Sequence, residues 1–523
     1  MAELVSTNQK KAVFYKNELK TEGADPSAIY ISEGDQAGYY YMYVTSDSLG
    51  VKGFLAYRSQ DMVQWECVGT ALSTFEQYDE ATGYTTVSYL SADYWAPEVI
   101  YDGNTGLYYL FYSATLRVDG VTRFYADIAV SDSPAGPFVS YNQYLGKDPV
   151  VIDEENKILA YAPVFDFANM DPEDPLYETK TGGYMKVIDM SPFVDPVSGK
   201  KYVYFCHDLA TELGITKSSI YVMALNDDYT PDYSKVYALT EAESALGESK
   251  VNEAPYVVYN AQSGKYYLLY SANAFYQKGY CVRVAVADRP VGPFRKLTQA
   301  EGGSLLYTDS AWTWAAGTGH CSIVSRDGQD YIVYHAHKEQ TEEALIRGVA
   351  MDELHWVENA DGLLVPVANG PSVTAMPLTA DQHENIASSA TITADHTAEG
   401  SVEDLRDGVV LYHDTAFLKS VVFDGSAATI NLQFDEVKSI NGIAIYNGSE
   451  DLFSGVASIR LQLAGGGVIT YKNLACAMAE GVVLPGSGVA VAFSSLNVVS
   501  IEIVMPASDA QYAISEIAVM AMK

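Results

Sequence analysis

Three carboxylates and one histidine lie near the beginning of short segments that resemble one another. Asp25 lies in ADPSAIY, Asp189 in IDMSPFV, Glu253 in NEAPYVV and His320 in GHCSIVS. Carboxylates that share a crowded site repel one another, so one keeps its proton while another stays ionised. General acid–base catalysis needs that pair of states. The pattern therefore predicts acid–base chemistry, provided that the fold brings these segments together.

The elements that would position these residues are repeated along the chain. A glycine turn followed by a tyrosine-rich strand occurs five times, as GYYYMYVTS, GLYYLFYSA, GKKYVYFCH, GKYYLLYSA and GQDYIVYHA, beginning at Gly38, Gly106, Gly199, Gly264 and Gly328. The related segments AVSDSPAGPF and AVADRPVGPF follow two of the copies. Radial repetition of antiparallel sheets produces this order, whereas a long β-sandwich would not. We therefore expect an all-β fold with a five-bladed β-propeller.

In a propeller the first strand of each blade lies nearest the axis, so equivalent positions surround one cavity. We expect Asp25, Trp95 (in WAPEVIY), Asp189, Glu253 and His320 to be those positions. Each acid taken singly could instead bind backbone N–H groups at a turn. Three acids at equivalent positions favour a catalytic cluster.

At these residues, from about residue 16 to 356, the chain resembles glycoside hydrolase family 43. The resemblance implies that Asp25 is the general base, that Glu253 is the general acid, and that Asp189 orients the acid and tunes its pKa. It also implies that Arg347 contacts the substrate or the catalytic acid, and that His320 contacts the substrate. No cofactor is required. In many members the histidine lies near a calcium or sodium ion, which here would be held through water at His320.

The implied reaction is inverting hydrolysis of α-L-arabinofuranosyl or β-D-xylosyl linkages in arabinan or arabinoxylan. In such enzymes the two carboxyl groups stand roughly 6.5–9.5 Å apart, which leaves room for the attacking water. Sugar rings bind on aromatic side chains. The candidate aromatic residues are Tyr94, Trp95, Phe193, Trp312 and Trp314, although each could instead belong to the core. The insertion at residues 160–183 is expected to be a loop over one face of the propeller.

The pattern changes after Trp356, and we expect a boundary near residues 376–385. Residues 1–375 are predicted to form the propeller and residues 386–523 a β-sandwich. Blocks such as ATINLQFDEVKSINGIAIYNG (residues 428–448) resemble the discoidin-like (coagulation factor 5/8 C-terminal) domain, which has a galactose-binding-like fold. Two roles are open for it, namely bracing the propeller or binding glycan.

Composition limits the partners. The net charge is −35, which argues against nucleic acid and anionic membranes as partners. No apolar run approaches the ~18 residues of a membrane span. The opening MAELVSTNQKK lacks the apolar core of a signal peptide. We expect a secreted or periplasmic protein whose signal has been removed, or a cytoplasmic one.

Two other functions compete with a hydrolase of arabinosides or xylosides. A fructosidase also joins a five-bladed propeller to a β-sandwich, but its WMNDPNG-type first block has an Asn and a Gly that ADPSAIY lacks. A non-catalytic glycan-binding propeller is expected to lose at least one of the three acids, and all three are present.

Overall fold

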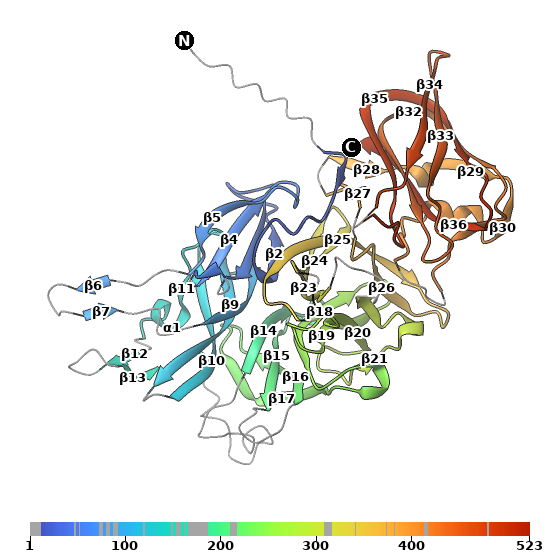
Figure 1. Ribbon diagram of the computed structural model, residues 1–523. Helices are drawn as coiled ribbons and strands as arrows, with labels where there is room; N and C mark the ends of the chain where they lie inside the picture. Colours follow the sequence, from blue (N-terminus) through green and yellow to red (C-terminus); the bar gives the residue numbers. More distant parts are fainter. Residues whose placement is uncertain are drawn as a thin grey trace, which may run out of the picture. The chain divides into compact units, whose positions relative to one another are not determined.

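The structure is a computed structural model (Figure 1). It describes residues 12–46, 49–51, 53–72, 77–79, 84–86, 93–118, 121–147, 150–152, 158–161, 163–165, 187–209, 217–307, 316–339, 341, 343–372, 374–380, 382–412, 417–478 and 481–523. The chain divides into two compact units, one of residues 18–368 and the other of residues 1–17 with 369–523. No helix in the described ranges is long and apolar enough to cross a membrane.

The unit of residues 18–368 contains five antiparallel sheets in chain order, which confirms the predicted five-bladed propeller (Figure 1). The first blade contains β2 (Ala24–Tyr30), β3 (Tyr40–Thr45), β4 (Phe54–Ser59) and β5 (Glu66–Thr70), and the second contains β8 (Tyr94–Asp102), β9 (Leu107–Val118), β10 (Val121–Ser131) and β11 (Val139–Ser140). The third contains β14 (Val187–Val194), β15 (Lys201–Leu209), β16 (Lys217–Leu225) and β17 (Pro231–Thr240), and the fourth contains β18 (Asn252–Asn260), β19 (Lys265–Ala272), β20 (Cys281–Ala287), β21 (Arg295–Lys296) and β22 (Ser304–Leu306). The fifth contains β23 (Gly319–Arg326), β24 (Gln329–His337), β25 (Arg347–Glu358) and β26 (Leu364–Ala368). The same unit contains the hairpins β6 (Gln77–Asp79) with β7 (Tyr84–Thr86) and β12 (Val150–Ile152) with β13 (Ile158–Tyr161), and the short helices α1 (Tyr141–Tyr144), η4 (Ser244–Leu246) and η5 (Gln299–Glu301).

The repeated sequence elements explain the blades. All five predicted turn glycines have φ between 66° and 90°, a backbone conformation that glycine adopts without a steric penalty. Each turn leads from the first to the second strand of its blade. The second strands carry alternating tyrosines into the core between sheets, where Tyr43, Tyr204, Tyr270 and Tyr334 are fully buried. The tyrosine-rich repeats are therefore core strands.

The ring of blades is closed by the first residues of the same unit. Glu22 forms a β-bridge with Gly348, and Gly23 N–H donates to the Arg347 carbonyl (3.3 Å). Val349 N–H donates to the Thr21 carbonyl (2.9 Å). The segment before β2 thus pairs with the beginning of β25, which joins the first blade to the last.

The other unit is a β-sandwich, as predicted. A nine-stranded sheet surrounds a core of Ile, Val, Leu and Phe side chains. Its strands are β28 (His383–Asn385), β29 (Ala390–Ala394), β30 (Thr397–Glu399), β31 (Val421–Phe423), β32 (Ala428–Asn447), β33 (Gly455–Leu463), β34 (Val468–Ala475), β35 (Gly488–Met505) and β36 (Tyr512–Met522). The short strands β1 (Phe14–Tyr15) and β27 (Met376–Pro377) pair with each other, and η6 (Ala387–Ser389) and η7 (Val402–Arg406) connect strands.

Candidate active site

The first strand of every blade has the same irregularity near its start. One residue has a positive φ, and the pairing with the second strand shifts there. The five residues are Asp25, Ala96, Asp189, Ala254 and His320. A bulge of this kind redirects side chains locally. It brings Asp25, Asp189 and His320 to equivalent positions.

The predicted equivalence was wrong by one residue in two blades. Trp95 and Glu253 precede the positive-φ residue and pair in register with Ser113 and Ser271 on the second strands. Sequence alignment of short blocks cannot show this, because a bulge leaves the residue types unchanged but alters which face a side chain occupies. Glu253 therefore approaches the cluster from a different position in its blade than Asp25 does.

Hydrogen bonds between neighbouring blades hold these bulges in place. The N–H of Ala96 donates to Thr45 Oγ1 (2.8 Å), that of Asp189 to Ser113 Oγ (2.8 Å), and that of His320 to Ser271 Oγ (2.9 Å). At the junction of the last and first blades, Asp25 N–H donates to His335 Nδ1 (3.2 Å). Each acceptor lies on the second strand of a blade, after its tyrosine-rich segment. The polar side chains at this position thus fix the backbone around the axis.

Asp25 is a buried carboxylate with three side-chain donors. Its Oδ1 accepts from Arg347 Nη1 (3.0 Å) and lies 3.2 Å from His320 Nδ1, and its Oδ2 accepts from Thr45 Oγ1 (2.7 Å). Burial alone would raise the pKa of Asp25, but the charges of Arg347 and His320 outweigh it and hold that pKa well below its usual range. Asp25 is therefore ionised, as a general base must be.

The two histidines beside Asp25 differ in charge, since His320 is a cation and His335 is neutral. Burial would lower the pKa of His320, but the carboxylates of Asp25 and Asp189 raise it to about 9, so this imidazole is a cation. Burial and the Arg347 charge lower the pKa of His335 to about 3. Neutral His335 can therefore accept the Asp25 N–H at Nδ1. Its ring stacks on Tyr280 with centroids 5.6 Å apart.

Glu253 has the properties of a proton donor. Burial, followed by the charge of Asp189, raises its pKa to about 8, so the group is mainly protonated at neutral pH. Tyr280 Oη donates to Glu253 Oε1 (2.8 Å). Asp189 Oδ2 accepts the N–H of Ala254 (2.9 Å), the residue next to Glu253. Asp189 therefore acts on Glu253 through both its charge and the adjacent backbone.

A further acid, Glu98, lies near the same cluster. It is buried, and Ser27 Oγ donates to its Oε2 (3.0 Å). Burial raises its pKa to about 8, and the positive charge of His320 opposes that rise. Its bond to Ser27, which also accepts the Val99 N–H (3.1 Å), links the first strands of the first two blades. We interpret Glu98 as a neutral structural group.

The predicted metal ion near the axis has little support from these residues. Among the described residues, no group of three or more His, Cys, Asp or Glu side chains is placed to hold a metal. His320, paired with Asp25 through Nδ1 and cationic, does not fit direct coordination, which requires neutral imidazole. Calcium or sodium held through water at His320 stays a prediction.

The aromatic candidates for sugar binding lie in different environments. Trp95 is half-buried next to the bulge of β8, and its ring centroid lies 5.7 Å from that of Phe124. Tyr94 is buried against Phe54 and Tyr112. These contacts make Tyr94 a core residue.

Phe193 lies four residues beyond Asp189 on β14. Its ring contacts Tyr204 and Tyr266 in the core of the neighbouring blades, so its contacts too are those of a core residue. Trp312, Trp314 and most of the insertion at residues 160–183 lie outside the described residues.

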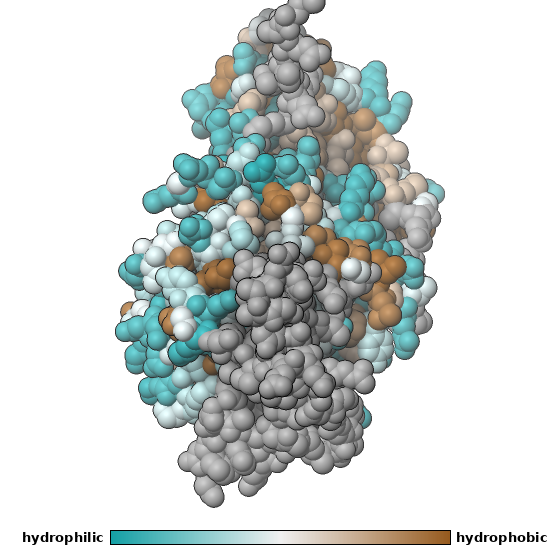
Figure 2. All heavy atoms as spheres, turned by 90° about the vertical axis from the view of Figure 1, so that its left-hand side faces the viewer, coloured by the Kyte–Doolittle hydropathy of each residue, from teal (hydrophilic) through white to brown (hydrophobic). Residues whose placement is uncertain are grey.

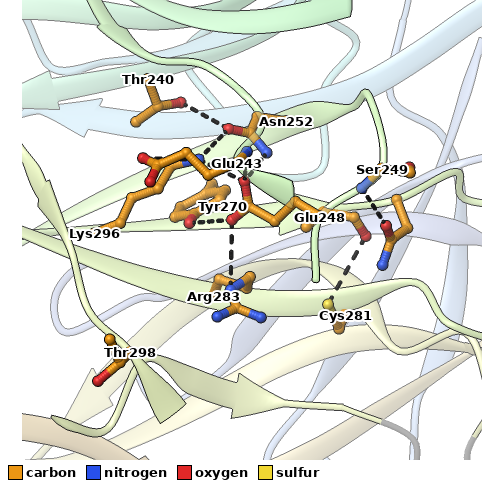
Figure 3. A network of polar contacts seen from close by, with 12 residues as sticks. Thr240, Glu243, Glu248, Ser249, Asn252, Tyr270, Cys281, Arg283, Lys296 and Thr298 are labelled. Atoms are coloured by element: carbon orange, nitrogen blue, oxygen red, sulfur yellow. Dashed lines mark hydrogen bonds and ion pairs between the residues drawn. The ribbon is translucent and has the colours of Figure 1, made fainter. Parts of the chain in front are cut away.

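A buried polar network anchors the residue before Glu253 (Figure 3). Asn252 Oδ1 accepts from Lys296 Nζ (2.8 Å) and Thr240 Oγ1 (3.2 Å), and Asn252 Nδ2 donates to Glu248 Oε2 (3.2 Å). Lys296 Nζ also donates to that carboxylate (2.6 Å). The Glu248 side chain is fully buried, and that of Lys296 is 4% exposed. The network fixes Asn252 and with it the start of β18.

We predict that Lys296→Met lowers the free energy of unfolding by about 3 kcal/mol, because it removes the closer of the two cations paired with the buried Glu248 carboxylate and leaves Arg283 Nε at 3.5 Å. The matched control is Lys265→Met in the same blade, where Lys265 pairs with exposed Asp288. Its effect should be less than about 1 kcal/mol. Urea unfolding of both variants measures the difference. Equal effects would contradict the importance given to the buried pair.

Sequence reasoning missed Tyr280 and His335. For His335 a signal existed, because Thr45, Ser113, Ser271 and His335 occupy the same position in the first, second, fourth and fifth copies of the tyrosine-rich segment. Tyr280 ends the loop between β19 and β20, and the corresponding loops of the other blades do not end in tyrosine, so no pattern indicated it. A Cβ at Gly319 would lie 2.1 Å from the Tyr280 ring, so the glycine before His320 is needed for this close approach.

Comparisons with known proteins found a matching family model and a similar solved structure. Residues 17–157 and 173–363 match the family model described as glycosyl hydrolases family 43. A solved structure of a thermostable family-43 glycoside hydrolase superposes with a TM-score of 0.50 at 27% identity, covering 69% of this chain and 98% of that chain.

Three curated relatives are similar to parts of the chain. The extracellular exo-α-(1→5)-L-arabinofuranosidase ArbA of Cellvibrio japonicus is 23% identical over 62% of this chain and 81% of its own length. The extracellular endo-α-(1→5)-L-arabinanase of Thermotoga petrophila is 24% identical over 52% of this chain and 50% of its own. The β-D-galactofuranosidase xynD of Aspergillus niger is 28% identical over 37% of this chain and 51% of its own length. The matched region spans about half the length of the last two relatives.

Proposed function

Since the chain belongs to glycosyl hydrolase family 43, we propose that it is an inverting glycosidase that cleaves α-L-arabinofuranosyl linkages in arabinan or arabinoxylan. The observation that carries this proposal is the division of protonation states among neighbouring carboxyl groups. Asp25 has a pKa well below its usual range, and Glu253 has a pKa of about 8. One base and one acid are thus available in the same site at neutral pH.

In the proposed mechanism Glu253 donates its proton to the glycosidic oxygen as the bond breaks. Asp25 takes a proton from water, which attacks the anomeric carbon from the opposite side. Asp189 keeps Glu253 protonated by its charge and holds the next backbone N–H. Arg347 and His320 orient Asp25 and keep it ionised before the water is bound.

The preference for an arabinofuranoside is supported by the relatives. Two of them are named for α-(1→5)-L-arabinose linkages and one for galactofuranose, so all three names refer to arabinosidic or furanosidic substrates. β-D-Xylosides are the alternative within the same mechanism, and fructosides and non-catalytic glycan binding are the alternatives outside it. Two relatives are also named extracellular, and we propose that this protein too acts outside the cell.

The stereochemistry of the product tests the proposal. Proton NMR during the first minutes of cleavage of 4-nitrophenyl α-L-arabinofuranoside should show the β-anomer first. First release of the α-anomer would refute the inverting mechanism. Cleavage of the matching β-D-xyloside alone would refute the substrate, and no cleavage of either, nor of arabinan or arabinoxylan, would refute the function.

The pKa values of the site predict the pH dependence of kcat/KM. Activity needs protonated Glu253, so it should fall as pH rises through about 8. The acid limb should lie at or below the ordinary range of an aspartate, because the pKa of Asp25 is depressed. Asp189→Asn removes a like charge, which lowers the pKa of Glu253 and moves the alkaline limb to lower pH. Glu98→Gln is the matched control and should leave that limb in place.

The C-terminal unit has no assigned role. Its discoidin-like identity stays a prediction, as do bracing of the propeller and binding of glycan.

A further inference from the structure

Most side chains described on the face drawn in Figure 2 are hydrophilic, with separate apolar patches among them.

Four exposed apolar residues come from two loops of the last two blades. Phe275 and Tyr276, each 37% exposed, lie in the loop between β19 and β20. Leu345 (65%) and Ile346 (45%) lie in the loop between β24 and β25. We call these four residues the apolar rim.

The two loops are joined by backbone hydrogen bonds, so the rim is preorganised. Ala344 N–H donates to the Tyr276 carbonyl (2.8 Å), and Gln277 forms a β-bridge with Glu343. His337 Nε2 donates to the Phe275 carbonyl (2.8 Å). A rigid apolar surface binds a partner without paying much ordering entropy.

The rim is connected to both catalytic carboxyl groups, to Asp25 through Arg347 and to Glu253 through Tyr280. The Arg347 guanidinium contacts Asp25 through Nη1, and its central carbon lies 4.8 Å from the centroid of the Phe275 ring. The loop that carries Phe275 and Tyr276 ends at Tyr280, which donates to Glu253. Arg347 Nε is buried and has no hydrogen-bond partner among the described residues.

We propose that the apolar rim binds the sugar ring on the leaving-group side of the cleaved bond. This inference rests on the proposed function. The reacting sugar ring must lie between Asp25 and Glu253. Arg347 lies between that position and the rim, so a sugar ring bound on the rim is the neighbour of the reacting ring. The rim loop borders Glu253, the acid that protonates the departing oxygen. Apolar and aromatic side chains pack against the C–H faces of a sugar, and the surrounding polar groups bind its hydroxyls.

The test compares two substrates that differ in the leaving group. Methyl α-L-arabinofuranoside releases methanol and has no ring for the rim, whereas α-(1→5)-L-arabinotriose has one. In the full-length chain, Tyr276→Ala and the double variant Leu345→Ala/Ile346→Ala should lower kcat/KM for the trisaccharide roughly 3- to 10-fold, as expected for lost aromatic and apolar contacts. The values for the methyl glycoside should stay close to wild type. Tyr237→Ala, an equally exposed aromatic on β17, is the control and should change neither.

The outcomes separate the rim from the function. Equal losses on both substrates, or no loss on either, would overturn the rim assignment while the wild-type activity stands. A loss in Tyr237→Ala of the same size would do so too. A wild type that cleaves no arabinoside would overturn the proposed function and the rim assignment with it.

Discussion

Glu253→Gln should lower kcat/KM for arabino-oligosaccharides by about 10²–10⁴-fold, the usual contribution of a general acid. A sugar is a poor leaving group unless the glycosidic oxygen is protonated as the bond breaks, and Gln cannot supply that proton. The loss should be much smaller for a 2,4-dinitrophenyl arabinofuranoside, whose leaving group departs without a proton. The part of the alkaline limb that Glu253 sets, near pH 8, should disappear, because the proton donor of the reaction is gone.

Stability gives the control for this variant. The folded state binds the Glu253 proton more tightly than the unfolded state does, so between the ordinary glutamate pKa and about 8 stability falls as pH rises. Gln removes that penalty, and the melting temperature at slightly alkaline pH should be equal to or above that of wild type. An inactive but less stable variant, or equal losses on both leaving groups, would contradict the assigned role.

The blades were predictable because their sequence signal is repeated. A glycine turn and alternating tyrosines specify one hairpin, and five copies in one order leave few folds other than a propeller. The ring closure was not predictable in this way. The bond between Gly23 and Arg347 joins residues at opposite ends of the unit through backbone groups, which carry no residue signature.

The site was predictable in its carboxylates but not in its geometry. Asp25, Asp189 and Glu253 are chemically distinctive residues in related blocks, whereas the bulge that offsets Glu253 by one position depends on backbone torsion. Tyr280 reaches Glu253 from the loop between β19 and β20, whose counterparts in the other blades do not end in tyrosine. Tyr94 shows the reverse error, because an aromatic beside the right motif has the same sequence signature whether it faces a sugar or the core.

Asp25→Asn should also lower kcat/KM by about 10²–10⁴-fold, because the amide cannot take a proton from the attacking water. Here the loss should be equally large for the 2,4-dinitrophenyl glycoside and for oligosaccharides, since every substrate needs the water. Stability should fall at neutral pH: the depressed pKa of Asp25 means that its ionised form stabilises the fold, and Asn leaves Arg347 and His320 without their counter-charge.

A second buried acid separates loss of the base from loss of stability. Asp195 directly follows the end of β14, accepts from Tyr266 Oη (2.7 Å), and has a pKa that neighbouring hydrogen bonds lower despite burial. Asp195→Asn should destabilise the propeller as Asp25→Asn does, yet keep activity at temperatures where it is folded. If Asp195→Asn loses as much activity as Asp25→Asn, the loss reflects folding and Asp25 is not the base. If Asp25→Asn loses activity only on oligosaccharides, it acts on the leaving group instead, and the assignment of acid and base must be reversed.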